Sequence, residues 1–176
     1  MSTKKRIVAV TISAVAILTV TMGMALASPA GGDQGCTPGY WKTHTDNWPG
    51  TDASDDDFGN AAVTAPGATM GDLFGHQKLA ATGLGSFDNV TIQDALSLQG
   101  GPGVVGAGNI LFRAAGAAWL NAADDRMNYA FRRTPSQSGI ADIYTMVRDS
   151  LGKRGAMLDV ATTLDNANNG AGGCPL

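Results

Sequence analysis

Apolar residues recur at helical spacing in several stretches of the chain, and no stretch shows the strict alternation of a half-buried strand. The clearest pattern covers residues 140–151, where apolar side chains fall at i, i+3, i+4, i+7 and i+11. Upstream, Thr134 suits an N-cap and Pro135 suits the first helical position. We therefore expect one helix to open at Thr134 and to end at Gly152.

The longest predicted helix spans roughly residues 103–123, and its apolar side consists largely of alanine. Small side chains permit close approach, so we expect this helix to lie centrally with others packed around it. Its polar side is predicted to carry Asn109, Arg113, Asn121 and Asp124.

Three further helices are indicated by local signals. A capping box begins at Thr69, and a second start signal lies at Thr91. Residues 155–167 form the last periodic stretch. The sequence thus predicts an all-α fold, an irregular bundle of four to five helices, formed by residues 36–176 as a single domain.

The N-terminus has the layout of a secretory signal peptide. Positive charges at residues 4–6 precede an apolar run that ends in Ala25-Leu26-Ala27, which signal peptidase accepts. We expect residues 1–27 to be cleaved and residues 28–35 to form a flexible leader, leaving no membrane attachment. The alternative is an uncleaved anchor, because about 20 apolar residues can span a bilayer.

The charge balance argues against nucleic acid as a partner. The net charge is −3, and removal of the three basic residues near the N-terminus makes the exported form more acidic. No basic stripe is present, so little counterion release is available to drive binding to DNA or RNA. All 15 acidic residues are aspartate, so any catalytic carboxylate must be an aspartate.

The chain contains two cysteines, Cys36 and Cys174, near the two ends of the predicted domain. In an oxidising compartment an even count favours pairing, and such a bridge would close a loop of 138 residues. One alternative is a zinc site that adds His44 and His76, although the paired ligand spacing typical of zinc sites is absent. Free thiols or intermolecular pairing are a further alternative.

Aromatic residues are concentrated directly after Cys36. Tyr40, Trp41, His44 and Trp48 crowd into nine residues of a chain with 6% aromatics. These rings could form a platform for stacking on sugars, or they could anchor the core beside the disulfide. His44 could also act with Asp46 as a general base, although a lone histidine is more often structural.

This segment, Cys-Thr-Pro-Gly-Tyr-Trp-Lys-Thr-His followed by Trp48, resembles the N-terminal signature of a widespread group of small secreted microbial proteins and domains. The resemblance continues in the Gly-Gly segment at 100–101, in Leu120-Asn121-Ala122, and in the terminal Cys174-Pro175-Leu176. It implies export and a Cys36–Cys174 pair. It implies no reaction.

A cluster of oxygen-bearing side chains, Asp52, Ser54, Asp56 and Asp57, loosely resembles a calcium loop. It lacks the glycine and the glutamate of such loops, so a solvated acidic loop is the competing interpretation. No other cofactor is indicated, because no phosphate-binding glycine loop, nucleophile elbow or zinc-protease motif is present.

These observations predict an exported, non-enzymatic module with a structural or binding role at the cell surface or outside the cell, in adhesion or in binding a polysaccharide, a matrix component or a surface protein. The alternatives are a secreted hydrolase that uses His44 with an aspartate, and a calcium-dependent binding module.

Overall fold

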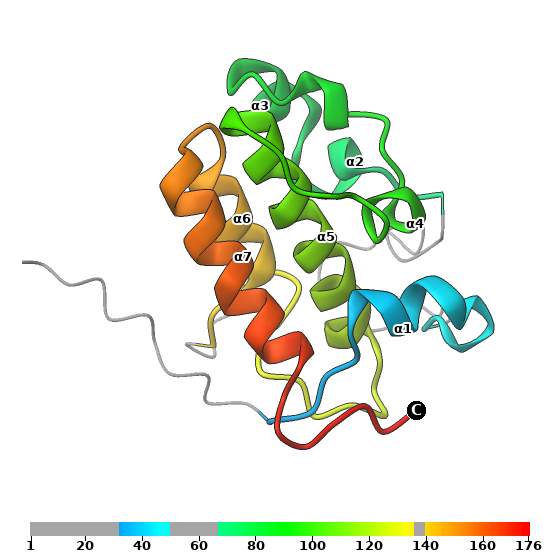
Figure 1. Cartoon of the computed structure of the whole chain (residues 1–176). Helices are drawn as coiled ribbons and strands as arrows, with labels where there is room; N and C mark the ends of the chain where they lie inside the picture. Colours follow the sequence, from blue (N-terminus) through cyan, green and yellow to red (C-terminus); the bar gives the residue numbers. More distant parts are fainter. Residues whose placement is uncertain (1–31, 50–66, 136–139) are drawn as a thin grey trace, which may run out of the picture.

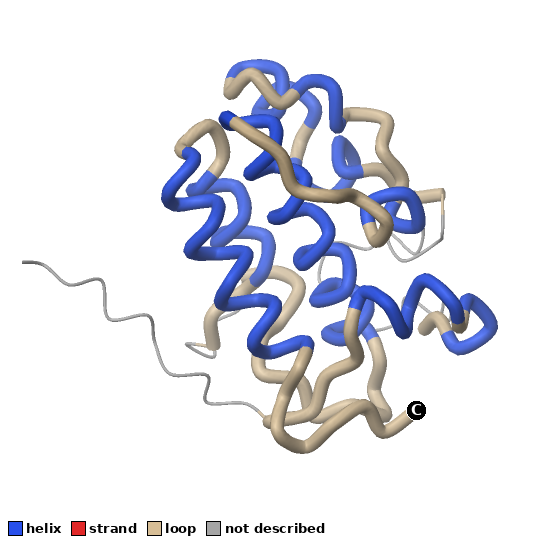
Figure 2. Tube along the Cα trace, viewed as in Figure 1, coloured by secondary structure: helices blue, strands red, loops and turns tan. Residues whose placement is uncertain are grey.

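A computed structural model of the chain describes residues 32–49, 67–135 and 140–176. These residues form helices and loops, with three isolated β-bridges and no longer strand among them (Figures 1 and 2). The α-helices are α1 (Pro38–Thr43), α2 (Met70–Phe74), α3 (His76–Ala81), α4 (Ile92–Ala95), α5 (Gly103–Ala123), α6 (Ile143–Ser150) and α7 (Arg154–Asn168). Two 3₁₀ turns are η1 (Thr45–Asn47) and η4 (Gly85–Phe87). The all-α class is confirmed, but seven helices in these residues replace the expected four to five.

α5 lies at the centre of the fold. Figure 1 shows α6 and α7 on one side of it, α2, α3 and α4 on the other, and α1 beside its C-terminal end. Between Gly106 and Asn121 its residues are buried around most of the circumference and not along one stripe. Within the described residues, α5 is also the helix long and apolar enough to cross a membrane. Because its apolar stretch is mostly buried inside the fold, it is the core helix of a packed domain.

Small residues let the neighbours of α5 approach closely. A Cβ added to Gly108 would lie 3.0 Å from the ring of Phe87 and 3.1 Å from Leu84, so the η4 loop packs directly on the helix backbone. Further along α5, Trp119 is buried and meets Phe74 edge-on, with 5.8 Å between ring centroids. The prediction of a tightly surrounded central helix is confirmed.

Two expected helix starts occur where the sequence signals place them. At α2, the Thr69 hydroxyl accepts a hydrogen bond from Asp72 N–H, and Asp72 accepts one from Thr69 N–H at 2.9 Å. Gly75, at φ 93°, then separates α2 from α3, so one predicted helix becomes two. Thr91 caps α4, which spans only four residues.

The predicted start of α6 at Thr134 is wrong. The helix begins at Ile143, capped by Asp142, whose side chain accepts from Thr145 N–H at 2.7 Å. Arg132 pairs with residues 141–143 through two backbone hydrogen bonds, of 3.2 and 2.9 Å, and this pairing holds residues 140–142 outside the helix. The N-cap signal at Thr134 is therefore overridden by contacts between the two sides of the loop.

Periodicity predicts Asn121 on the polar side of α5, and this prediction is wrong because the residue is 0% exposed. Its Oδ1 accepts hydrogen bonds from Cys36 N–H at 3.0 Å and from the Trp41 indole at 2.8 Å. Its Nδ2 donates to the Cys36 carbonyl at 2.9 Å and to Asn168 Oδ1 at 2.8 Å. The amide thus uses its full hydrogen-bonding capacity inside the protein.

Asn168, near the end of α7, extends this network. Its Oδ1 also accepts from the Tyr129 hydroxyl at 2.8 Å, and its Nδ2 donates to the Ala114 carbonyl at 2.9 Å. Burial raises the pKa of Tyr129 well above its ordinary value, so the phenol remains a hydrogen-bond donor. The network joins the N-terminal segment, α5, the loop after α5, and α7.

The two ends of the domain form what we call the terminal clasp, residues 33–36 with residues 170–174. Cys36 and Cys174 are joined by a disulfide, with 4.6 Å between their Cα atoms, which confirms the predicted pair. Backbone hydrogen bonds run from Gly35 N–H to the Gly173 carbonyl at 3.0 Å and from Gly172 N–H to the Asp33 carbonyl at 2.9 Å. The clasp is therefore closed both covalently and by backbone pairing.

We predict that Asn121→Ala lowers the free energy of unfolding by roughly 3–5 kcal/mol, because several buried polar groups lose their partners at once. Denaturant unfolding measures the change. Asn109→Ala is the matched control on the same helix: Asn109 is only partly buried and makes one hydrogen bond, to the Gln99 carbonyl. Equal losses in the two variants would contradict the assignment of Asn121 as the central residue.

We predict that the double variant Cys36→Ala/Cys174→Ala folds but is less stable, by at most about 4–5 kcal/mol, because the disulfide no longer restricts the unfolded chain. The fold persists because Asn121 binds the backbone of residue 36, which alanine retains. Circular dichroism and denaturant unfolding test both statements. A wild-type midpoint that is unchanged by reductant, with reduction verified by mass, would count against a stabilising bond.

Candidate functional site

The aromatic segment folds into what we call the aromatic arm, residues 38–48, which comprises α1, η1 and Trp48. Thr37 caps α1, and Pro38 occupies its first position. This register directs Trp41 into the core, where it is 0% exposed and its indole binds Asn121. Trp41 is therefore a core anchor and cannot belong to an exposed binding platform.

The other three predicted residues of the arm reach its surface. The exposed ring of His44 lies nearly parallel to the half-buried ring of Tyr40, with 4.2 Å between centroids and 7° between planes. Trp48 is also half-buried, and its indole donates to the Trp41 carbonyl at 2.9 Å. Tyr40, His44 and Trp48 thus present ring surface while their polar atoms are largely engaged within the arm.

Arg126 secures the arm to the end of α5. Its guanidinium donates to both carboxylate oxygens of the buried Asp124, at 2.9 and 2.7 Å. It also donates to the Asn47 carbonyl at 3.1 Å, while the Asn47 side chain donates to the Tyr40 hydroxyl at 2.6 Å. Hydrogen bonding to Asp124 raises the pKa of Arg126. Asp124 was expected on the polar side of α5, and its burial is explained by this ion pair.

His44 does not form a pair with Asp46 in the described residues. Its Nδ1 lies 3.0 Å from both the Thr43 hydroxyl and the Tyr40 carbonyl, and Asp46 is exposed on η1. The hydrolase interpretation needs a carboxylate within hydrogen-bond reach of His44, and the described residues place none there. The geometry of this part of the chain favours a stacked surface ring over a catalytic one.

The structure bears on the predicted zinc site but not on the predicted calcium site. The zinc alternative required thiolate ligands, and both sulfurs are instead joined in the disulfide. The calcium candidates Asp52, Ser54, Asp56 and Asp57 lie outside the described residues. Across residues 32–49, 67–135 and 140–176, no group of three histidine, cysteine or acidic side chains is arranged to hold a metal ion.

Sequence reasoning missed a second polar cluster, formed by Asp72, His76 and Asp88. His76 Nδ1 lies 2.8 Å from Asp88 Oδ1, and its Nε2 lies 3.5 Å from Asp72 Oδ1. Gly71 makes the approach possible, because a Cβ there would overlap both the His76 ring and Asp88. The four-residue spacing of Asp72 and His76 in the sequence indicates that the two side chains can meet. Asp88 is distant in sequence and is brought to His76 by the loop that contains η4.

Asp72 is the electrostatically perturbed member of this cluster. Hydrogen bonds from the Thr69 backbone and hydroxyl are the largest causes that lower its pKa, and His76 lowers it further. Since the folded-state pKa is below the unfolded value of 3.8, the ionised form stabilises the fold. This contribution is complete above about pH 4 and is lost as the pH falls through the folded-state pKa.

We therefore predict that, as the pH is lowered from neutral through about pH 4 and below, Asp72→Asn loses less stability than wild type. At neutral pH the variant loses less than about 1 kcal/mol, since Asp72 is half exposed and solvent screens its interactions. Urea unfolding across this pH range measures both effects. Asp159→Asn, which removes one exposed aspartate from α7, controls for net charge. Identical pH profiles for wild type and Asp72→Asn would refute the prediction.

Comparison of the chain with models of protein families, with curated proteins and with solved structures yields no match. The candidate site is therefore interpreted from its own geometry.

Proposed function

We propose that this chain is exported and acts outside the cytoplasm as a non-enzymatic module that binds a polysaccharide or a surface protein. The observation that carries the proposal is the disulfide of the terminal clasp. Disulfides form and persist in oxidising compartments and are rare in the cytosol. The apolar N-terminal segment and the resemblance to small secreted microbial proteins support the same location.

Cleavage of the signal segment is compatible with the clasp. In the described residues, Asp33 is the first residue to bond the C-terminal tail, and the predicted cleavage site after Ala27 lies upstream of it. Removal of residues 1–27 therefore leaves the clasp, the disulfide and the contacts of Cys36 with Asn121 intact. Pairing of the ends after export then stabilises the mature domain.

Binding is proposed to occur at the aromatic arm. Tyr40, His44 and Trp48 lie on one short, well-anchored segment, and flat aromatic surfaces stack on the apolar faces of sugars. The arm is held by Trp41 in the core and by Arg126 at the end of α5, so its surface is preorganised. A preorganised surface loses little conformational entropy on binding.

The test first determines the intact mass of the secreted protein with and without reductant. We expect the mass of residues 28–176, rising by two hydrogens on reduction. Pull-down with insoluble peptidoglycan, chitin and cellulose then tests the arm. We expect binding to one of these polymers that weakens at least tenfold in His44→Ala/Trp48→Ala, with helix content checked by circular dichroism.

The matched control is Gln77→Ala/Gln93→Ala, which truncates two exposed polar side chains on α3 and α4, away from the arm. Its binding is expected to equal that of wild type. Retention of the chain in the cytoplasm with reduced thiols would refute export. Absence of binding to every polymer and to intact cell surfaces would refute the binding role.

A further inference from the structure

The two longest helices, α5 and α7, run in the same direction, so the positive ends of their dipoles lie at the same end of the molecule. The C-terminal parts of α5 and α7 meet where Asn121 donates to Asn168, and Figure 1 shows both helices starting at the opposite end. Neither N-terminus has a side-chain cap: the N-cap residues are Pro102 and Lys153. Each helix dipole therefore contributes roughly half a positive charge at that end.

Basic side chains gather at the same end from separate elements; we call Lys78, Arg148, Lys153 and Arg154 the basic end. A Cβ on Gly75 would lie 3.9 Å from both the Arg148 guanidinium carbon and Lys78 Cβ, so α3 and α6 bring these two residues together.

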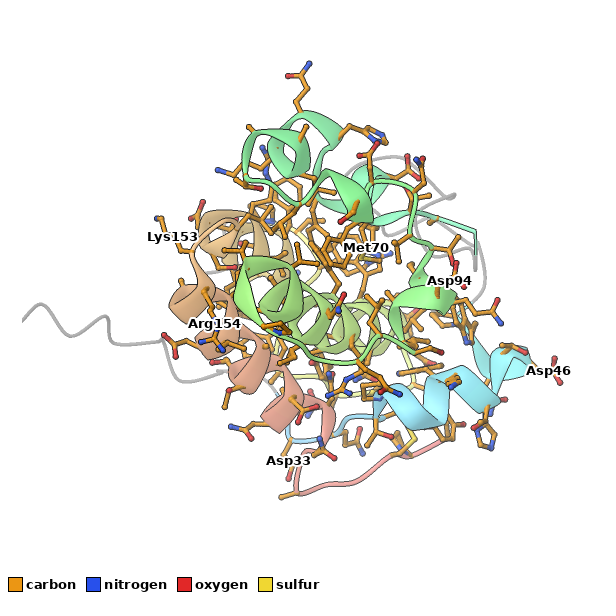
Figure 3. All side chains as sticks on the ribbon, turned by 45° about the horizontal axis from the view of Figure 1, so that its top comes forward. Asp33, Asp46, Met70, Asp94, Lys153 and Arg154 are labelled. Atoms are coloured by element: carbon orange, nitrogen blue, oxygen red, sulfur yellow. A yellow bond between two sulfur atoms is a disulfide. The ribbon has the colours of Figure 1, made fainter. Side chains whose placement is uncertain are left out.

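The other two basic residues follow Gly152. A Cβ on Gly152 would lie 3.1 Å from Thr82 Cβ, and Thr82 N–H donates to the Lys78 carbonyl at 3.2 Å. The turn between α6 and α7 thus places Lys153 beside the end of α3. Figure 3 shows Lys153 and Arg154 on the same side of the molecule, away from Asp33 and Asp46.

These charges are not neutralised by ion pairs within the described residues. Lys78, Lys153 and Arg154 have no carboxylate within ion-pair distance there, and the Arg148 guanidinium instead lies 4.9 Å over the ring of Tyr144. Asp149 is an exposed acidic neighbour on α6. On a chain of net charge −3, four cations and two helix N-termini therefore form a local positive surface.

We infer that the basic end is a docking surface for a linear anionic polysaccharide, an inference that rests on the proposed extracellular location. Repeated anionic groups complement several fixed cations spread over three elements, and oppositely charged surfaces steer association. A membrane fits less well, because in the described residues Val105 is the one large apolar side chain that is strongly exposed.

The experiment measures binding of the oxidised, secreted protein to alginate as a carboxylate polymer and heparin as a sulfate polymer, at several salt concentrations. We expect a dissociation constant that rises steeply with salt. Lys153→Gln/Arg154→Gln should weaken binding roughly tenfold or more, because each cation near an anionic surface contributes about a factor of five. The matched control Arg113→Gln/Arg132→Gln removes two cations outside both the basic end and the aromatic arm and should bind within about twofold of wild type.

Other outcomes overturn the inference. Equal weakening in both double variants would show that total charge, and not the basic end, drives binding. Stronger binding to single-stranded DNA or to anionic phosphatidylglycerol vesicles than to either polysaccharide would assign a different partner. Absence of binding by a correctly exported, oxidised protein would refute the inference while leaving export and the aromatic arm intact, since the arm is also tested with the uncharged polymers chitin and cellulose and with separate variants.

Discussion

The buried amide of Asn121 joins parts of the chain that are far apart in sequence. Its four hydrogen bonds reach Cys36, Trp41 and Asn168. An unpaired amide in the core would cost a large fraction of the stability of a small domain, so α5, the N-terminal segment and α7 must meet in one arrangement. The disulfide reinforces that arrangement because Cys36 is itself bound on both its N–H and carbonyl groups.

Much of the helical fold could be predicted from local information. The start of α5 follows from the Gly-Pro break before it, and the cap of α2 follows from Thr69 and Asp72. Contacts distant in sequence could not be read in this way. Periodicity within α5 gives Asn121 a side of the helix but does not reveal that α7 and the N-terminal segment cover that side. The start of α6 was misplaced because Arg132 pairs with residues 141–143, and no local motif encodes that pairing.

In the candidate site, too, local features could be predicted from the sequence, whereas contacts between distant residues could not. Aromatic density located the arm, but only the register of α1 separates the buried Trp41 from the surface pair of Tyr40 and His44. His76 and Asp88 are brought together across a loop that has no periodicity, so their contact had no signal beyond the glycine at 71. The disulfide was predictable because the signal-like N-terminus predicts an oxidising compartment, where an even number of cysteines favours pairing.

The hydrogen bond between Asn121 and Asn168 lies at the C-terminal ends of two helices that run in the same direction. The dipoles of α5 and α7 are therefore aligned and do not cancel. Their negative ends lie toward the terminal clasp, where Arg126 forms its ion pair with Asp124 just after α5. Their positive ends are left uncapped beside Lys153 and Arg154. The buried amide network and the basic end therefore lie at opposite ends of α5, a helix of 21 residues.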